Sequence, residues 1–159
     1  MDVAAAKKSV EKFSELLRYQ LYDQQQTVPI NQELRYLSNF ILLQQTRSSE
    51  KLQLATHFDE NLDGQQVYPL LFLPLVENAF KYVGGDYNMQ ISVALQGGNI
   101  EFHVVNGIPA CPPENNRIDK GIGLENLRRR LELLYPERHT LTTEKNGKNF
   151  SAALTLQYL

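Results

Sequence analysis

Apolar residues recur at helical spacing through the first fifty residues of the chain. The recurring positions form two groups: Phe13, Leu16, Leu17 and Leu21, and then Leu34, Leu37 and Ile41. A repeat of three to four residues is typical of amphipathic helices. Pro29 lies between the groups and cannot continue a helix, whereas Asn31 is a suitable N-cap with Glu33 in the first turn. The pattern predicts two helices within residues 1–50, separated by a turn at about 26–30.

Beyond residue 50 the pattern changes to alternation. Leucine, threonine and phenylalanine alternate with glutamine, alanine and histidine over residues 52–58, which predicts a half-buried strand. Residues 69–82 are apolar on most faces and predict a buried helix. Pro74 lies within this run, so it either kinks the helix or marks its effective start.

Two β-hairpins and one more helix account for the rest of the chain. Alternating apolar positions flank Gly97-Gly98 and Asn146-Gly147, and such pairs favour two-residue turns. Between the hairpins, a leucine stripe predicts a helix over residues 123–135, which ends before Pro136. The stripe consists of Leu124, Leu127, Leu131 and Leu134.

The resulting order is two helices followed by β-α-β-β-α-β-β. Such an order predicts an α+β fold, a two-layer α/β sandwich with helices on one face of a mixed, mostly antiparallel sheet. We expect residues 1–50 to form a helical segment and residues 51–159 to form the sandwich domain.

Composition limits the classes of function. The 159 residues include 16 basic and 18 acidic side chains, a balance that gives no support for nucleic acid as a partner. Cys111 is the only cysteine, which excludes an intrachain disulfide and a multi-cysteine zinc site. The longest apolar run, residues 70–76, is far shorter than the roughly 20 residues that span a bilayer. The first residues look like the cut edge of a longer protein.

Two short segments combine polar groups in a way that suits a metal-bound polyphosphate. Asn78 and Lys81 are i,i+3 neighbours on the predicted buried helix. An amide oxygen can ligate Mg²⁺ and an ammonium group can meet a phosphate. Gly121 and Gly123 open the next helix, where free N–H groups attract anions. Taken alone, the first segment is more often a solvated helix surface and the second is more often a tight loop. The sequence has no P-loop and no protein-kinase motif.

The order and spacing of these segments resemble the C-terminal ATP-binding domain of LytS-type sensor histidine kinases. The family fold is the Bergerat ATP-binding sandwich, which agrees with the layers predicted above. The resemblance covers about residues 10–159 and includes part of the helical region that precedes the domain. It rests on five segments: Leu16–Tyr19, Glu33–Gln45, Pro74–Lys81, Gly121–Asn126 and Arg128–Pro136.

The resemblance implies roles for individual residues. Asn78 is expected to be the Mg²⁺ ligand, and Lys81, with Tyr82 beside it, is expected to contact the nucleotide phosphates. Glu77 is similar to the family's acidic neighbour of that asparagine, with a polarising role, so Glu77 and Asn78 are the expected catalytic pair. Asn106 stands where the family has an aspartate that reads the adenine amino group.

The resemblance also implies a second glycine box. Gly121, Gly123 and Leu124 are expected to form it over the nucleotide, and Asn126 is expected to help cap the helix that follows. In the first glycine box both glycines are replaced, by Ile108 and Ala110, which weakens the expectation of tight nucleotide binding.

The chemistry implied is phosphoryl transfer rather than ATP hydrolysis. Pro74 occupies the place where related ATPases carry a glutamate, and proline cannot activate water. The three histidines, His57, His103 and His139, lie on predicted strands and a turn, whereas the family's acceptor lies on a helix upstream. The chain is therefore expected to lack its acceptor and not to phosphorylate itself.

Taken together, the resemblance implies the cytoplasmic catalytic region of a two-component sensor histidine kinase. Its cofactors would be ATP and Mg²⁺, and the phosphoryl group would pass through the upstream histidine to an aspartate of a response regulator receiver domain. A homodimer would form through the N-terminal helices, and the full-length parent would lie in the bacterial inner membrane. Two other readings stay open: a degenerate signalling and dimerisation module that binds ATP poorly, and a non-kinase ATP-binding switch.

Overall fold

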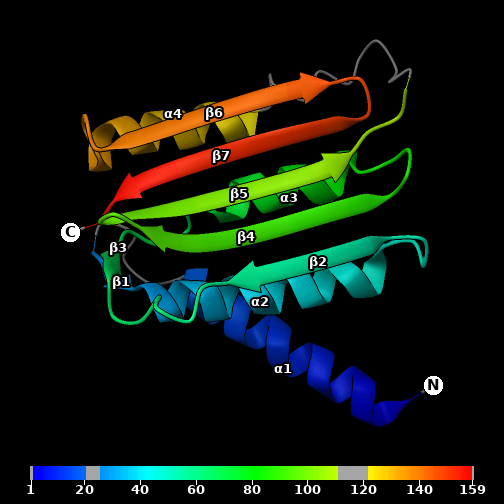
Figure 1. The fold of residues 1–159 in the computed structure, drawn as a ribbon. Helices are drawn as coiled ribbons and strands as arrows, with labels where there is room; N and C mark the ends of the chain where they lie inside the picture. The colour runs from blue at the N-terminus through cyan, green and yellow to red at the C-terminus, as the bar shows by residue number, and fades with distance from the viewer. Residues whose placement is uncertain (1, 21–25, 111–121, 159) are drawn as a thin grey trace.

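The computed structural model describes residues 2–20, 26–110 and 122–158 (Figure 1). The helices and strands follow one another as α1 (Val3–Gln20), β1 (Val28–Pro29), α2 (Ile30–Arg47), β2 (Gln53–Phe58), β3 (Gln66–Val67), α3 (Leu73–Tyr82), β4 (Asn88–Gln96), β5 (Asn99–Gly107), α4 (Ile122–Leu134), β6 (His139–Asn146) and β7 (Asn149–Gln157). The predicted order of the larger elements is confirmed.

Five strands form one sheet in the order β2-β4-β5-β7-β6. β2 pairs with β4 in parallel, and the other neighbours are antiparallel. Figure 1 shows α2, α3 and α4 on one face of this sheet, while no described helix covers the other face. This arrangement confirms the predicted two-layer α+β sandwich.

One continuous hydrophobic core fills the space between sheet and helices. Inward-facing residues of β4, β5 and β7 pack against apolar side chains of α3 and α4, and the rings of Phe72 and Phe102 stack with centroids 4.9 Å apart. Leu34, Leu37 and Ile41 of α2 belong to the same core. The second predicted helix therefore packs directly on the sandwich.

The connection into α2 differs from the predicted turn and N-cap. Residues 28–29 form a short strand that pairs with β3. The N–H of Ile30 then bonds to the Gln65 carbonyl at 2.7 Å, and Pro29 with φ −61° is the N-cap residue. Asn31 lies inside the helix, so its predicted capping role is wrong. The physical reason is that the pairing of β1 with β3 starts the helix two residues earlier than predicted.

The hairpin turns follow the predicted local chemistry with one shift. Gly97 and Gly98 have φ of 58° and 83°, values that suit glycine in a two-residue turn. In the last hairpin, Asn146 still pairs with Asn149, so the turn consists of Gly147 and Lys148 instead of Asn146-Gly147. Because Asn146 stays paired, β6 and β7 are joined by a two-residue loop, which is the common short connection between antiparallel strands.

The helix α1 extends away from the sandwich and packs against α2 (Figure 1). Lys12 Nζ donates to Asn39 Oδ1 at 2.9 Å. Val3, Val10 and Phe13 are exposed, whereas the side chains of residues 15–20, which include the whole Leu16–Tyr19 motif, lie outside the described part. In the ranges that the structure describes, no helix combines the length and apolar character needed to cross a bilayer.

Candidate functional site

The end of the sandwich where β5 stops brings several elements together. Gly84, in the loop after α3, donates its N–H to the Gly107 carbonyl at the end of β5, at 2.9 Å. A Cβ atom on Gly107 would overlap the Gly84 carbonyl and the Asn88 amide oxygen. Only glycine fits here without displacing its neighbours, so the loop after α3 is fixed against the end of β5.

Asn106 places a buried amide beside this contact. Its side chain is 1% exposed, and Nδ2 donates to the Gly107 carbonyl at 3.2 Å. The other amide atom, Oδ1, is buried and has no hydrogen-bond partner among the described residues. A buried acceptor without a donor costs about 1–3 kcal/mol, so this oxygen is an unsatisfied acceptor among the described residues at the end of β5.

Four residues of the expected site lie on the outer surface of α3. Pro74 occupies the first turn of this helix, where proline is tolerated, which confirms that it marks the start of the helix. Glu77 and Lys81 are exposed, whereas Asn78 and Tyr82 are half-buried. Partial burial raises the pKa of Glu77. The Lys81 ammonium lies 5.2 Å from the centre of the Tyr82 ring, within cation–π range.

A groove of about 550 Å³ separates α3 from the C-terminal end of α2. Glu77 and Lys81 line it from α3, and Arg47 lines it from α2. Asn78 and Asn106 are not among its lining residues. Successive residues of a helix are about 100° apart, so Asn78 points about a quarter turn away from Glu77. The expected site residues are thus divided between two sides of α3.

The second glycine box is described only in part. Gly121 lies outside the described residues, and α4 begins at Ile122. The space around a Cβ on Gly123 is open, and Leu124 is buried in the core. Asn126 is exposed one turn into α4, so it is not at the N-cap and its predicted capping role is wrong. The helix starts four residues before it.

The segment after β5 contains Ile108 and Ala110, the residues at the two expected glycine positions. Ile108 is 2% exposed and belongs to the core, and its N–H bonds to the Lys148 carbonyl at 2.9 Å. Ala110 is exposed. Apolar burial therefore holds the backbone at Ile108, where the family relies on glycine.

No group of three or more histidine, cysteine, aspartate and glutamate side chains could hold a metal ion within residues 2–20, 26–110 and 122–158. The Mg²⁺ expected at Asn78 is of another kind. Such ions take few protein ligands and several oxygens from substrate phosphates and water. A single amide oxygen on α3 fits a metal that arrives with a nucleotide.

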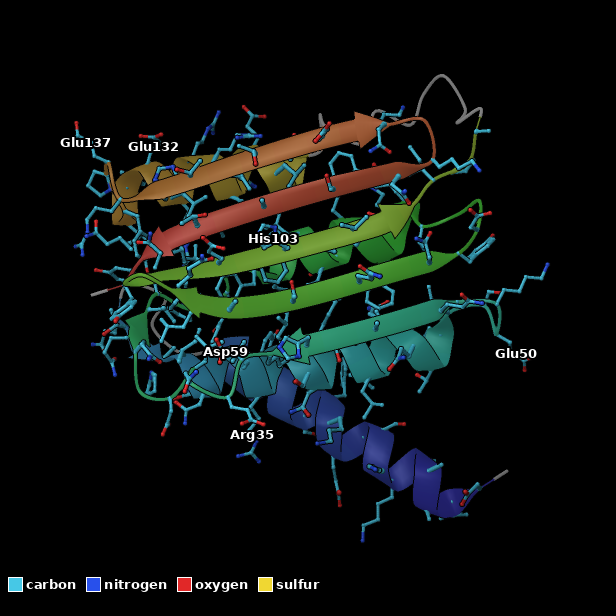
Figure 2. All side chains as sticks on the ribbon, in the orientation of Figure 1. Arg35, Glu50, Asp59, His103, Glu132 and Glu137 are labelled. Atoms are coloured by element: carbon cyan, nitrogen blue, oxygen red, sulfur yellow. The ribbon has the colours of Figure 1, made fainter. Side chains whose placement is uncertain are left out.

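All three histidines lie on strands. His57 is in β2, and His103 of β5 lies on the helix-free face of the sheet (Figure 2), 3.8 Å from Glu101. His139 is the first residue of β6 and does not lie in a turn, because the turn closes earlier with a bond from Arg138 N–H to the Tyr135 carbonyl. That the acceptor lies outside this chain stays a prediction.

Sequence reasoning missed one cation. Of the three consecutive arginines of α4, Arg129 is exposed and pairs with Glu125 at 3.1 Å. Arg130 is half-buried and donates to the Pro69 carbonyl at 2.7 Å. Its position beside Leu131 of the buried stripe was the signal that could have identified it.

Comparison with known proteins finds similarity to histidine kinases in both sequence and fold. The histidine-kinase family model matches residues 1–52. The sensor protein kinase HptS of Staphylococcus aureus is 28% identical over 119 residues, which are 75% of this chain and 21% of HptS. By these matches the chain is similar to sensor histidine kinases. It spans about a fifth of the length of the curated relatives that it matches.

Solved histidine kinases share the fold. The histidine kinase AdeS of Acinetobacter baumannii superposes with a TM-score of 0.56 at 14% identity, over 96% of this chain and 77% of that one. The catalytic domain of the histidine kinase ThkA gives a TM-score of 0.56 at 17% identity, over 82% and 94% of the two chains. At this identity the likeness concerns the fold alone. The finer assignment to the LytS type stays a prediction.

Proposed function

We propose that this chain is the catalytic region of a two-component sensor histidine kinase and binds Mg-ATP. The observation that carries the proposal is the buried, unpartnered Oδ1 of Asn106. The amino group of adenine is a donor that this oxygen could accept. In the proposal, Asn78 ligates Mg²⁺, and Lys81 and Tyr82 lie along the phosphates.

The remaining contacts in the proposal come from the start of α4. Gly121, Gly123 and Leu124 would bring backbone close to the nucleotide, since helix N-termini and glycines favour bound anions. Asn126, exposed in the first turns of α4, would reach the same ligand with its side chain.

The reaction proposed is transfer of the γ-phosphoryl group. The bond from the γ-phosphorus to the bridging oxygen breaks, ADP leaves, and a histidine nitrogen outside this chain takes the phosphoryl group. A receiver-domain aspartate of a response regulator then accepts it. The bound Mg²⁺ would neutralise phosphate charge, while Glu77 polarises the site and the missing base at Pro74 limits hydrolysis.

The N-terminal helices would supply the dimer. We propose that residues 1–50 are the partial dimerisation and linker helices and that residues 51–159 are the catalytic domain. Exposed Val3, Val10 and Phe13 on α1 support this role, because apolar side chains on one helix favour a second helix as a neighbour. The parent protein would be anchored in a bacterial inner membrane with this region on the cytoplasmic side.

One observation favours a second candidate function. Ile108 fills a core position where the family has a glycine, and a side chain there leaves less room for backbone to approach a ligand. A degenerate signalling and dimerisation module would keep the fold and the helices without useful ATP binding.

Calorimetric titration of the chain with ATP separates the two candidates. The kinase proposal predicts one ATP per chain in the presence of Mg²⁺ and much weaker binding after a chelator removes the metal. Absence of binding at millimolar ATP would reject the kinase proposal and favour the degenerate module. A folded sample, verified by circular dichroism, is the necessary control.

A further inference from the structure

Three consecutive residues before α3 are held by side chains from two different helices. The Glu33 carboxylate of α2 accepts the N–H of Leu70 at 2.7 Å. From the opposite direction, the Arg130 guanidinium of α4 donates to the Pro69 carbonyl at 2.7 Å. Adjacent backbone groups are therefore bonded to α2 and to α4.

A third bond extends the connection to the end of α4. The Tyr135 hydroxyl accepts the N–H of Tyr68 at 3.0 Å, and the two rings meet edge to face with centroids 5.7 Å apart. Glu33 acts electrostatically on both Tyr135 and Arg130. These groups form one network, which we call the α2–α4 connection: Glu33, Tyr68, Pro69, Leu70, Arg130 and Tyr135.

The two charged members of the α2–α4 connection differ in burial, because Glu33 is buried and Arg130 is half-buried. Glu33 is 2% exposed. Burial lowers the pKa of Arg130, and the negative charge of Glu33 raises it again. Removing Glu33 would take away a negative charge that favours the ionised form of Arg130. The two side chains, 97 positions apart in the sequence, bond to the same stretch of backbone.

The backbone between them has an unusual conformation. Leu70 has φ of 62°, in the left-handed region that side chains other than glycine seldom adopt. Such a conformation persists only where surrounding contacts impose it. Here the contacts are the Glu33 hydrogen bond and the packing of Leu70 against Tyr36 and Leu73. The segment is thus held in one position relative to α2.

The α2–α4 connection joins α2 to the two helices that carry residues of the proposed nucleotide site. α1 packs on α2 at one end. At the other end, α4 carries Gly123 and Asn126, and α3 begins three residues after Leu70 and carries Asn78. A shift of α2 would displace residues 68–70, whose backbone groups are hydrogen-bonded to Arg130 and Tyr135.

We propose that Glu33 and Arg130 are positioning residues that couple α2 to α4 through residues 68–70, so that displacement of the N-terminal helices changes nucleotide affinity. The effect on nucleotide rests on the proposed function, whereas the mechanical coupling does not. Neither side chain contacts the proposed ligand; both act through the backbone between them.

Hydrogen exchange of the whole chain, measured by peptide mass spectrometry, tests the coupling itself. Glu33→Gln keeps the size of the side chain, and Arg35→Gln is its matched control because Arg35 is exposed and projects from α2 into solvent (Figure 2). Arg130→Met is matched by Arg129→Met. Coupling predicts that Glu33→Gln raises exchange about fivefold in α4 and that Arg130→Met does so in α2, with little change in β5.

Two results would overturn the coupling. One is increased exchange confined to the substituted helix and residues 68–70. The other is an equal increase in every element including β5, which would mean general loss of stability. If Arg130→Met does not fold, Arg130→Lys replaces it, because lysine keeps a cationic donor but cannot make the same planar contact.

Titration with Mg-ATP tests the link to the site. Each of Glu33→Gln and Arg130→Met should weaken binding about fivefold, and the double variant should be no weaker than the weaker single variant, because both interrupt one connection. A double variant weakened by the product of the two single effects would contradict a shared connection. If the parent chain binds no ATP, the proposed function fails, and the exchange experiment still decides the coupling.

Discussion

At the scale of single residues, the Asn106 amide is asymmetric in its surroundings. Its nitrogen is bonded to the Gly107 carbonyl, and its oxygen has no partner among the residues that the structure describes. The Gly107 carbonyl also accepts from Gly84, so the amide is held with its oxygen free for another donor. The resemblance singled out this residue, and its proposed role toward adenine stays a prediction.

Replacing Asn106 by aspartate should therefore discriminate between bases. A carboxylate makes a charge-assisted hydrogen bond to the amino group of adenine, so Asn106→Asp should tighten ATP binding by roughly 1 kcal/mol. Guanine presents an acceptor at the same edge, so GTP should not gain. Calorimetry with both nucleotides measures the difference. Equal effects on ATP and GTP would mean that Asn106 does not read the base.

Asn78 supplies a second residue-scale prediction. If its amide oxygen ligates the metal, Asn78→Ala should weaken Mg²⁺-dependent ATP binding by about 1–3 kcal/mol. Asn31→Ala is the control, since Asn31 is an exposed asparagine of α2 that is not among the expected site residues. Unchanged ATP affinity of Asn78→Ala would remove Asn78 from the proposed site.

At the scale of elements, the turn that follows β2 is hydrogen-bonded to β4 through Asp59. The Asp59 carboxylate accepts N–H groups from Asn61 at 2.9 Å and from Leu95 at 3.2 Å. These bonds hold the pKa of Asp59 below its ordinary value of 3.8, chiefly through the Asn61 backbone N–H. Since the ionised form is favoured in the folded state, its stabilising effect is complete above the unfolded pKa and disappears as pH falls through the folded pKa.

A pH series of urea unfolding measurements checks this sign. Asp59→Asn should unfold more easily than the parent near neutral pH, because an amide oxygen is a weaker acceptor than a carboxylate. The difference should shrink as the pH falls below about 4. Glu60→Gln, a change at an exposed neighbour, is the control. A difference between Asp59→Asn and parent that does not depend on pH would contradict the role assigned to the charge.

Elements with local signals were predictable, and those that depend on distant partners were not. The Gly97-Gly98 hairpin and the start of α3 at Pro74 follow from turn and helix chemistry within a few residues. The β1–β3 pairing joins residues 28–29 to 66–67, and no local pattern marks two-residue strands. Glu33 and Arg130 meet residues 37 and 61 positions away, so sequence spacing gave no indication of their shared role.

The same distinction applies to the candidate site. The motif on α3 was recognisable, but the helix directs its residues to two sides. Glu77 and Lys81 line the groove together with Arg47, whereas Asn78 is not among the lining residues. Helical spacing alone placed Asn78 and Lys81 on one face. The packing of α2 beside α3 determines that Lys81 lines the groove and that Asn78 does not.

At the scale of the whole molecule, the positions of the histidines limit what the chain can do alone. Phosphoryl transfer needs an acceptor within about 3–3.5 Å of the phosphorus and in line with the leaving oxygen. His57, His103 and His139 lie on strands. We therefore expect the chain to bind ATP without labelling itself when it is incubated with γ-labelled ATP.

Adding back the upstream helix with its histidine should restore a label that is stable in base and labile in acid. Mutation of that histidine should abolish the label again. The expectation is contradicted if the 159-residue chain acquires an acid-labile label that disappears on mutation of His57, His103 or His139.

The most direct measurement is a nuclear magnetic resonance titration of the isotope-labelled chain with ADP and Mg²⁺. If adenine nucleotides bind as proposed, the side-chain amide signals of Asn106 and the backbone amides of Gly107 and Asn78 shift together, and GDP shifts them much less. Shifts confined to the groove around Arg47 and Lys81, with the Asn106 signals unmoved, would contradict the proposed adenine site.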